Sequence, residues 1–411
     1  MKLALIIDDY LPSSTRVGAK MFHELALELQ SHGHTITVIT PECCQVKTLM
    51  IDDLDGITVW RFKSGPLKDV GRIHRAINET LLSTKAWKSV QHLISGNSFD
   101  GIVYYSPTIF WGGLVHKIKH RCRCPAYLVL RDMFPQWVID AGIIKEDSLV
   151  DKYFRVFEKK SYDQADCIGL MSDKNLEVFQ KKQSGYNCEI LRNWASVSPV
   201  QTDKYGCAKS FRVRLSLEGK ILFLYGGNIG HAQDMANLMR LARNMQDYEQ
   251  AHFLFVGQGD EVELINNLAR QWQLTNFTYI PPVSQDEFKA LLTEVDVGLF
   301  SLSPKHSSHN FPGKLLGYMV QSIPILGSVN NGNDLSDLVN NNCAGFIHIN
   351  GEDEKLFYSA KRLLMDPELR HRLGDGANKL LRQQFSVTAA ARAIEGSLEA
   401  DYETNRSYHT V

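Results

Sequence analysis

A lysine at the start of a predicted helix is the residue in this chain best placed to bind an anion. Lys314 follows the loop 309–313, of sequence HNFPG, and opens a helix predicted over 314–320. A cation in the first turn does not stabilise the helix itself, because the helix dipole favours negative charge there. Backbone N–H groups of such a loop and of a helix N-terminus bind phosphate groups. The stretch therefore predicts a diphosphate site, with an ordinary loop–helix–strand corner as the alternative.

A glycine turn offers a second phosphate contact. Gly226, Gly227, Asn228 and Ile229 follow the apolar run 220–225, of sequence KILFLY. A backbone without side chains can approach an anion closely, so the turn is predicted to face the same ligand. The alternative is that the two glycines only permit a tight turn and close helix packing.

Three aspartates are candidates for proton transfer. Asp132 comes after the apolar run 126–130, separated from it by Arg131, and Asp8 and Asp9 come after the apolar run 3–7. Ligands of parallel sheets bind beyond the carboxyl ends of the strands, where a carboxylate can take a proton from a bound hydroxyl. We therefore predict Asp132 as a general base, with Asp9 and Asp8 ranked second. The alternative is that Asp132 is a helix cap or a partner for Arg131.

Short apolar runs alternate with segments of helical period along almost the whole chain. In the first half, strands are predicted at 3–7, 35–40, 57–62, 101–105, 126–130, 167–171 and 188–191, with helices at 19–32, 70–95, 110–120 and 153–164. In the second half, strands are predicted at 220–225, 252–257, 277–280, 295–300 and 323–326. This alternation predicts an α/β fold of two Rossmann-like, doubly wound parallel-sheet lobes. A stretch without apolar period at 195–217 separates the lobes, which we place at 1–195 and 210–385.

Composition indicates an ordinary globular chain. It has 411 residues, a net charge of −1, 22% charged residues and 44% hydrophobic residues. The amino terminus lacks the order of a signal peptide, and no run approaches the ~18–20 apolar residues of a membrane span, so a cytoplasmic location is expected. The eight cysteines include no C-x-x-C pair, and no histidine pair has metal spacing. Free thiols and no metal are expected.

One segment is strongly basic. Between Arg61 and Arg131 there are twelve Lys and Arg and three acids. Aromatic residues interleave with the cations, as on a surface that meets anionic headgroups. The predicted acceptor or membrane surface comprises Trp60, Arg72, Arg75, Trp87, Lys88, Phe110, Trp111 and Arg131. A solvated helix face is the alternative, and nucleic acid is disfavoured because the surplus is local.

Five motifs in order resemble a known family. They are D-Y-x-P at 9–12, GHTITVIT at 33–40, RDMFP at 131–135, YGGNIGHAQ at 225–233 and FPGKLLGYM at 311–319, the last followed by IPIL. Together they resemble the GT-B glycosyltransferases of family 4. Within that family the chain looks closest to WbuB-type N-acetyl-L-fucosaminyltransferases of bacterial O-antigen biosynthesis.

The resemblance implies a UDP-sugar donor and no metal cofactor. It also implies an undecaprenyl-diphosphate-linked N-acetylglucosamine acceptor and a peripheral location on the cytoplasmic face of the inner membrane. A terminal helix within 386–411 is expected to cross back to the first lobe, and the two lobes to face a central cleft. The implied donor-binding residues are Gly226, Gly227, Asn228, Ile229, Ile280, Pro281, His309, Asn310, Phe311 and Lys314.

The chain departs from the family pattern in its charged donor contacts. Many members carry two glutamates eight positions apart, and His309 and Gly317 occupy those positions here. The usual arginine and lysine after the first strand of the second lobe are replaced by Asn228 and Gln233. Ribose recognition must therefore come from elsewhere, and Lys314 is the main cation that can be named.

Two other function classes and two stereochemical outcomes stay open. UDP-sugar 2-epimerases share the two-lobe architecture but need no acceptor surface, and a non-catalytic nucleotide-sugar-binding partner would need no base. An inverting transfer would need a protein base, whereas a retaining one would use the leaving phosphate and backbone groups.

Overall fold

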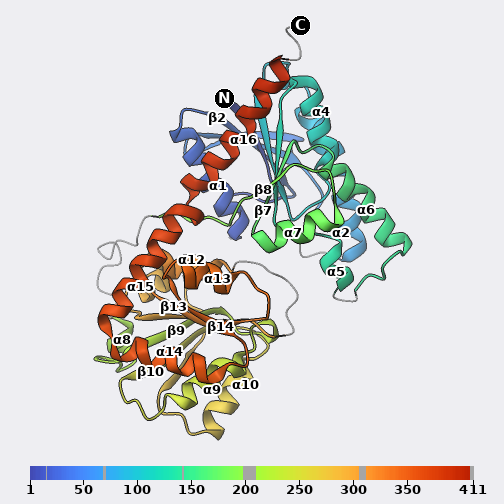
Figure 1. Ribbon diagram of the computed structural model, residues 1–411. Helices are drawn as coiled ribbons and strands as arrows, with labels where there is room; N and C mark the ends of the chain where they lie inside the picture. The colour runs from blue at the N-terminus through green and yellow to red at the C-terminus, as the bar shows by residue number, and fades with distance from the viewer. Residues whose placement is uncertain (15, 68–70, 141–142, 198–209, 305–311, 408–411) are drawn as a thin grey trace. The chain divides into compact units, whose positions relative to one another are not determined.

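The computed structural model describes all residues except 15, 68–70, 141–142, 198–209, 305–311 and 408–411. The chain divides into two compact units (Figure 1). The amino-terminal unit comprises residues 1–195 and 387–411, and the carboxy-terminal unit comprises residues 196–386. Each unit is a parallel sheet with helices on both faces, so the prediction of two doubly wound α/β lobes is confirmed.

The sheet of the amino-terminal unit has eight strands in the order β3-β4-β2-β1-β5-β6-β7-β8. Its strands are β1 Lys2–Ile6, β2 Thr35–Glu42, β3 Leu49–Leu54, β4 Ile57–Lys63, β5 Gly101–Ser106, β6 Ala126–Leu130, β7 Cys167–Leu170 and β8 Cys188–Ile190. All neighbours pair in parallel except β3 and β4, which are antiparallel. β3 was not predicted from the sequence, because this edge strand, LMIDDL, has no alternating pattern and none of its side chains is buried.

Helices cover both faces of this sheet. They are α1 Val17–Ser31, α2 Arg72–Thr80, α3 Leu82–Val90, α4 Gly112–Cys122, α5 Gln136–Asp140, α6 Leu149–Tyr162, α7 Asp173–Lys182 and α16 Val387–Ser407. Alternate side chains of β1 point to opposite faces. Leu3 and Leu5 pack in the cluster that contains α1 and α16 residues, whereas Ala4 and Ile6 pack with residues of α3 and α4.

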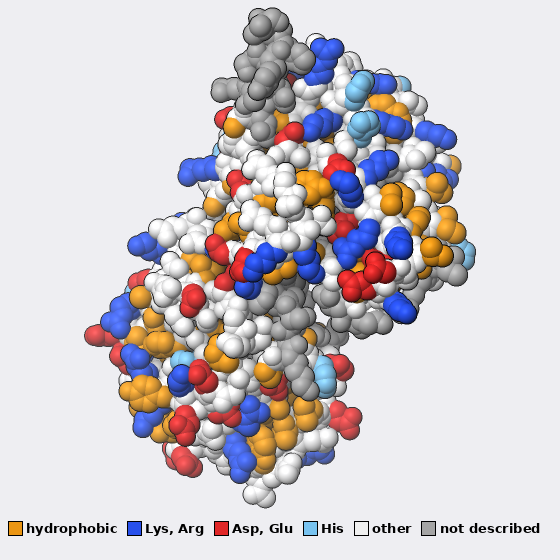
Figure 2. Space-filling view, turned by 45° about the vertical axis from the view of Figure 1, so that its right-hand side comes forward, with side chains coloured by type: hydrophobic (Ala, Val, Ile, Leu, Met, Phe, Trp, Pro, Cys, Tyr) orange, Lys and Arg blue, Asp and Glu red, His pale blue; other side chains and the backbone are white. Residues whose placement is uncertain are grey.

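The long helix predicted over 70–95 is instead two helices, α2 and α3. At their junction the Thr80 hydroxyl donates to the carbonyl of Ala76, a contact that bends helices. The Ser83 hydroxyl donates to the carbonyl of Phe110, which fixes the start of α3 against the loop before α4. In Figure 2 the unit at the top displays many Lys and Arg side chains, with hydrophobic side chains between them.

The carboxy-terminal sheet has six parallel strands in the order β11-β10-β9-β12-β13-β14. They are β9 Ile221–Asn228, β10 Ala251–Gln258, β11 Phe277–Ile280, β12 Val297–Ser301, β13 Ile325–Val329 and β14 Gly345–Ile349. The α-helices are α8 Phe211–Arg214, α9 Met235–Asn244, α10 Val262–Gln271, α11 Gln285–Leu292, α12 Gly313–Val320, α13 Leu335–Asn341, α14 Asp353–Met365 and α15 Pro367–Leu380. β13 begins after Pro324, not at the predicted Ile323, since proline cannot donate to a ladder.

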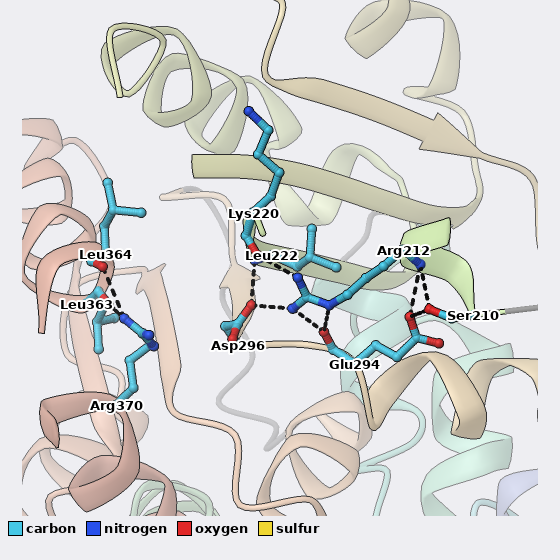
Figure 3. A network of polar contacts seen from close by, with 9 residues as sticks. All are labelled: Ser210, Arg212, Lys220, Leu222, Glu294, Asp296, Leu363, Leu364 and Arg370. Atoms are coloured by element: carbon cyan, nitrogen blue, oxygen red, sulfur yellow. Dashed lines mark hydrogen bonds and ion pairs between the residues drawn. The ribbon is translucent and has the colours of Figure 1, made fainter. Parts of the chain in front are cut away.

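A polar network fixes the first helix of this unit to its sheet (Figure 3). The guanidinium of Arg212 on α8 donates to the carboxylate of Asp296 at 2.7 Å and to the carbonyls of Lys220 and Glu294. The Asp296 carboxylate also accepts the backbone N–H of Leu222 on β9 at 2.8 Å. The charge of Arg212 is therefore satisfied within the unit, and this residue is structural.

Candidate functional site

In the carboxy-terminal sheet, the order in which the chain adds strands reverses between β9 and β12. From β9 the chain builds β10 and β11 on one side, then returns to build β12, β13 and β14 on the other. The crevice beyond the carboxyl ends of two such strands is where ligands bind in this class of sheet. Gly227 lies at the end of β9, and a Cβ atom placed on it would lie 3.7 Å from Nζ of Lys314. The structure thus brings two predicted donor residues together at this crevice.

Lys314 is held over an aromatic ring. Its Nζ donates to the hydroxyl of Tyr225 at 2.6 Å and lies 3.9 Å from the centroid of the Tyr225 ring. Burial lowers the pKa of Lys314 to about 7. None of the described carboxylates pairs with it. A bound anion would supply the countercharge that this ammonium lacks.

The four residues of the glycine turn differ in exposure: Gly227 and Asn228 are exposed, whereas Gly226 and Ile229 are buried. Gly227 is exposed and has φ +119, a conformation that favours glycine. Gly226 is buried, donates its N–H to the hydroxyl of Tyr318 at 3.3 Å, and packs so closely on the ring of Phe288 that a Cβ would clash. The prediction that Gly226 contacts the donor is therefore corrected to a packing role.

Ile229 is also corrected. Its side chain is fully buried in the core, and its N–H donates to the carbonyl of Gln258 at 2.8 Å. It thus has neither a side chain nor a backbone donor to offer a ligand. Asn228 is exposed, and its side-chain amide donates to the Gln233 side chain at 2.9 Å. The two residues that replace the usual arginine and lysine therefore bond to one another.

A histidine beside this turn was missed by the sequence analysis. Nδ1 of His231 lies 2.9 Å from a carboxylate oxygen of Glu261, which is buried and also accepts the N–H of Met235. The His231 side chain is itself 91% exposed. This pair had no signal in the sequence, because its members are thirty positions apart and no short motif joins them.

The remaining predicted donor residues lie either at the end of the edge strand β11 or outside the described residues. Ile280 and Pro281 lie at the carboxyl end of the edge strand β11, with β10 between them and β9. His309, Asn310 and Phe311 lie outside the described residues. Gly317 is on α12, where an added Cβ would lie 3.4 Å from the side chain of Leu292.

In the amino-terminal unit the corresponding reversal lies between β1 and β5. Asp8 and Asp9 follow β1, and Asp132 follows β6, the neighbour of β5. Asp132 is exposed, and the pKa of its carboxylate is raised overall. Desolvation by the surrounding protein raises this pKa most, the Arg131 guanidinium lowers it in part, and the Asp8 carboxylate raises it further. A carboxylate with a raised pKa holds a proton more firmly, as a general base requires.

Asp9 is committed to local contacts. Its carboxylate accepts the hydroxyl of Ser14 at 2.7 Å and lies 3.6 Å from Nε of Arg16. These contacts order the loop between β1 and α1. Asp9 is thus less suited than Asp132 to accept a substrate proton.

Three members of the predicted acceptor or membrane surface are buried, which corrects their assignment. Trp111 and Phe110 lie in the core between the sheet and α4. Arg131 is 7% exposed, donates to the carbonyl of Leu191 at 2.6 Å and stacks over Trp194. Burial lowers the pKa of Arg131 to about 10. Its role is to tie the end of β6 to the end of β8.

The other members of that surface remain accessible. Trp60 and Trp87 are half-buried, and Arg75 and Lys88 are exposed. The side chain of Arg72 lies outside the described part of the chain. Lys117 and Arg121 both lie over the Trp87 ring, with the Arg121 guanidinium 4.5 Å from its centroid.

Two further observations concern metals and membranes. In the described part of the chain, one group of three possible metal ligands is present, formed by Glu42, Cys43 and Cys44 at the end of β2. The seven described cysteines carry free thiols. No described helix is both long enough and apolar enough to cross a membrane.

The chain is similar to known glycosyltransferases. Residues 208–380 match the family described as Glycosyl transferases group 1. The chain is 24% identical to the probable glycosyltransferase WbjE of Pseudomonas aeruginosa over 53% of its own length and about half, 54%, of WbjE. It is 23% identical to the putative colanic acid biosynthesis glycosyl transferase WcaI of Escherichia coli K12, over 77% of this chain and 80% of WcaI.

A solved structure shares the fold. HepE from Anabaena, in complex with UDP and glucose, superposes with a TM-score of 0.65 at 14% identity, over 97% of this chain and all of HepE. The chain, with its two successive α/β units, therefore has the GT-B fold.

Proposed function

We propose that this chain is a GT-B hexosyltransferase that moves N-acetyl-L-fucosamine from a UDP-linked donor to a lipid-linked N-acetylglucosamine. Assembly of a bacterial surface polysaccharide of the O-antigen type is the proposed role. WcaI is described as a colanic acid biosynthesis enzyme, which supports polysaccharide assembly. The identity of the donor sugar rests on the motifs that resemble WbuB-type enzymes.

One observation carries the donor side of the proposal. Lys314 is a half-buried ammonium beside the exposed Gly227 at the carboxyl end of β9, and Tyr225 is its described partner. A nucleoside diphosphate supplies the missing anion, and HepE binds UDP on the same fold. When the bond from the sugar carbon to the diphosphate breaks, Lys314 can stabilise the charge that develops on the leaving oxygen.

On the acceptor side we assign the proton to Asp132. The acceptor hydroxyl oxygen forms the new bond to the sugar carbon, and its proton passes to the Asp132 carboxylate. The raised pKa of Asp132 suits this role. In a retaining reaction the leaving phosphate would take that proton, so the anomeric configuration of the product, read by NMR, decides whether the base is needed.

We further propose that the enzyme works without a metal at the cytoplasmic face of the inner membrane. The basic segment 61–131 favours attraction to an anionic bilayer. A lysine and a helix N-terminus can replace a metal at the diphosphate. Activity should therefore survive a chelator, and a loss that Mg²⁺ or Mn²⁺ restores would contradict metal independence.

The reaction class is tested by incubating the full chain with UDP-sugars, with and without a lipid-linked N-acetylglucosamine. We expect UDP release and a new glycoside only when the acceptor is present. A change in the donor sugar without acceptor would indicate a 2-epimerase instead. Binding of UDP-sugars without any product would indicate a non-catalytic binding partner.

The donor site is tested by Lys314→Ala. Loss of a charged contact to phosphate should weaken UDP binding by ~1.5–3 kcal/mol, because hydrogen bonds to charged groups are worth that much. Calorimetric titration of UDP measures the change. Lys289→Ala on α11 is the matched control, since Lys289 is accessible and pairs only loosely with Asp286 at 3.7 Å. Equal UDP affinity in the wild type and Lys314→Ala would refute the assignment.

A further inference from the structure

A cavity of about 170 Å³ lies among α3, α4 and α6 of the amino-terminal unit. Ile109 and Phe110 in its wall belong to the loop that joins β5 to α4, beyond the carboxyl end of β5. At that end the carbonyl of Ser106 accepts the N–H of Arg131, the residue before Asp132. The loop that supplies Ile109 and Phe110 therefore starts at the same edge of the sheet as the candidate base.

Two glycines at the start of α4 make room for this cavity. A Cβ on Gly112 would lie 2.5 Å from the carbonyl oxygen of Lys160, so α4 can pack against the backbone of α6 only with glycine there. A Cβ on Gly113 would lie 3.2 Å from Cβ of Ser83 and 3.7 Å from Nζ of Lys160. The ammonium of Lys160 thus occupies the space beside Gly113, where a larger residue would compete with it.

Two lysines give the wall of the cavity a positive charge, beside the neutral hydroxyls of Thr80, Ser83 and Thr84. Lys117, Lys160 and His116 line it, and no described carboxylate pairs with either lysine. The nearby acids already have cationic partners: Glu158 pairs with Arg155 at 2.9 Å, Asp163 with Lys159 at 2.9 Å and Glu79 with Arg75 at 2.9 Å. A concave site with one sign of charge attracts the opposite sign, here an anion.

Exposed hydrophobic side chains lie next in sequence to two lining residues: Leu81 follows Thr80, and Val156 precedes Phe157. Thr80 and Phe157 line the cavity, and the Thr80 hydroxyl contacts that of Tyr153, which holds the end of α2 against α6. Large hydrophobic side chains on these helices are 40–87% exposed: Ile77, Leu81, Leu149, Val150, Tyr153 and Val156. Exposed hydrophobic groups on the segments that supply a lysine-lined cavity suit a ligand with an anionic head and a hydrocarbon chain.

We propose that this cavity binds the diphosphate of the lipid-linked acceptor, with Lys117 and Lys160 at the phosphates and Leu81 and Val156 against the hydrocarbon chain. The inference rests on the proposed function, because it assigns the acceptor of that reaction to this edge of the sheet. It gives the basic segment 61–131 a defined site instead of a diffuse attraction to the bilayer. The site would hold the lipid end of the acceptor, whereas Asp132 serves its sugar hydroxyl.

The test is calorimetric titration of the full chain with farnesyl diphosphate, a short soluble prenyl diphosphate. We expect binding that Lys117→Ala with Lys160→Ala weakens about 10-fold or more, because charge-assisted contacts to phosphate are lost. Leu81→Ser with Val156→Ser should weaken farnesyl diphosphate but leave inorganic pyrophosphate unchanged. Lys174→Ala with Lys181→Ala on α7 is the charge-matched control, and all these side chains are accessible enough for the variants to fold.

Other outcomes would contradict either the site or the proposed function. Pyrophosphate that binds as tightly as farnesyl diphosphate would mean that the cavity recognises phosphate alone. Lysine-dependent binding to vesicles of phosphatidylcholine with phosphatidylglycerol, without binding to farnesyl diphosphate, would indicate membrane headgroups. Unchanged KM for the lipid-linked acceptor in the lysine variant would refute the site while the transferase stands. Farnesyl diphosphate binding without sugar transfer would refute the proposed function while the site stands.

Discussion

At the scale of single residues, the contact with Tyr225 stabilises the Lys314 ammonium at a helix N-terminus, where a positive charge is otherwise disfavoured. The lysine lies in the first turn of α12, where the helix dipole disfavours positive charge, and its pKa falls to about 7 on burial. The ring and hydroxyl of Tyr225 are the described groups that stabilise it. A lysine whose charge is disfavoured by burial and by the helix dipole is stabilised when an anion binds beside it.

UDP binding should therefore depend on pH through Lys314. In the free protein this lysine loses its proton as pH rises through about 7, whereas bound diphosphate raises its pKa. Binding then takes up a proton, so UDP affinity should fall by up to ~10-fold between pH 7.5 and 8.5. Calorimetry in two buffers of different ionisation enthalpy measures the proton uptake.

Lys314→Met is the control for that pH dependence. It should bind UDP weakly and with no change in proton uptake over the same interval. If the wild type and Lys314→Met show the same pH dependence, another group is responsible and the assignment to Lys314 fails.

Asp132 gives a second prediction at this scale. Asp132→Asn keeps the size of the side chain but cannot accept a proton, so turnover should fall by roughly 10²–10⁴-fold. UDP affinity should hardly change, because Asp132 and Lys314 belong to different units. Turnover of UDP-sugar with acceptor and calorimetric UDP binding are the two measurements. Near-normal turnover would make Asp132 structural and leave Asp8 as the next candidate.

At the scale of elements, the ends of β9 and β10 are brought together by glycine. Gly257 on β10 has φ +154, and a Cβ there would lie 1.8 Å from the carbonyl oxygen of Gly227 on β9. The hydroxyl of Tyr279 on β11 donates to the carbonyl of Gly257 at 3.0 Å. Three neighbouring strands thus share one tightly packed edge, which positions Gly227 for the ligand.

Gly257→Ala should consequently destabilise the carboxy-terminal unit by more than ~2 kcal/mol, because the backbone must shift to admit the methyl group. Denaturant unfolding measures the free energy. Gly396→Ala is the matched control: Gly396 lies in α16 with open space around it, and alanine should stabilise that helix by ~0.5–1 kcal/mol. Equal unfolding free energies for the wild type and Gly257→Ala would contradict the clash.

At the scale of the whole molecule, α16 returns the end of the chain to the amino-terminal unit. Ala391, Ile394 and Leu398 are buried in the cluster that contains Leu3 and Leu5 of β1. The Glu395 carboxylate lies 2.8 Å from ring nitrogens of both His32 and His34. The amino-terminal unit is thus completed by residues that follow the carboxy-terminal unit in sequence.

Ile394→Ala should lower the stability of the amino-terminal unit by ~2–5 kcal/mol, the usual cost of a buried large-to-small change. Hydrogen exchange should increase in β1 and α1 and stay unchanged in β9 and β10. Arg392→Ala on the exposed face of the same helix is the control. Equal loss of protection in both units would show that α16 stabilises the molecule in another way.

Local patterns were sufficient for the order of elements and for some site residues. The strand 126–130 and the strand 277–280 have the bounds expected from their apolar runs. Lys314 and Asp132 could be selected because their positions after a loop or a strand are local features. The two-lobe fold likewise follows from alternation along the chain, since strands and helices bury one face each.

Only the tertiary structure decided which of these residues are buried and which are exposed. Sequence periodicity cannot show whether Gly226, Ile229, Phe110 and Trp111 are buried, because their burial depends on packing against elements that are distant in sequence. The partner of Lys314, Tyr225, is 89 positions away, and the strand order that makes them neighbours cannot be derived from a run of apolar residues. Burial and strand pairing are set by contacts between elements, whereas local patterns report only the elements themselves.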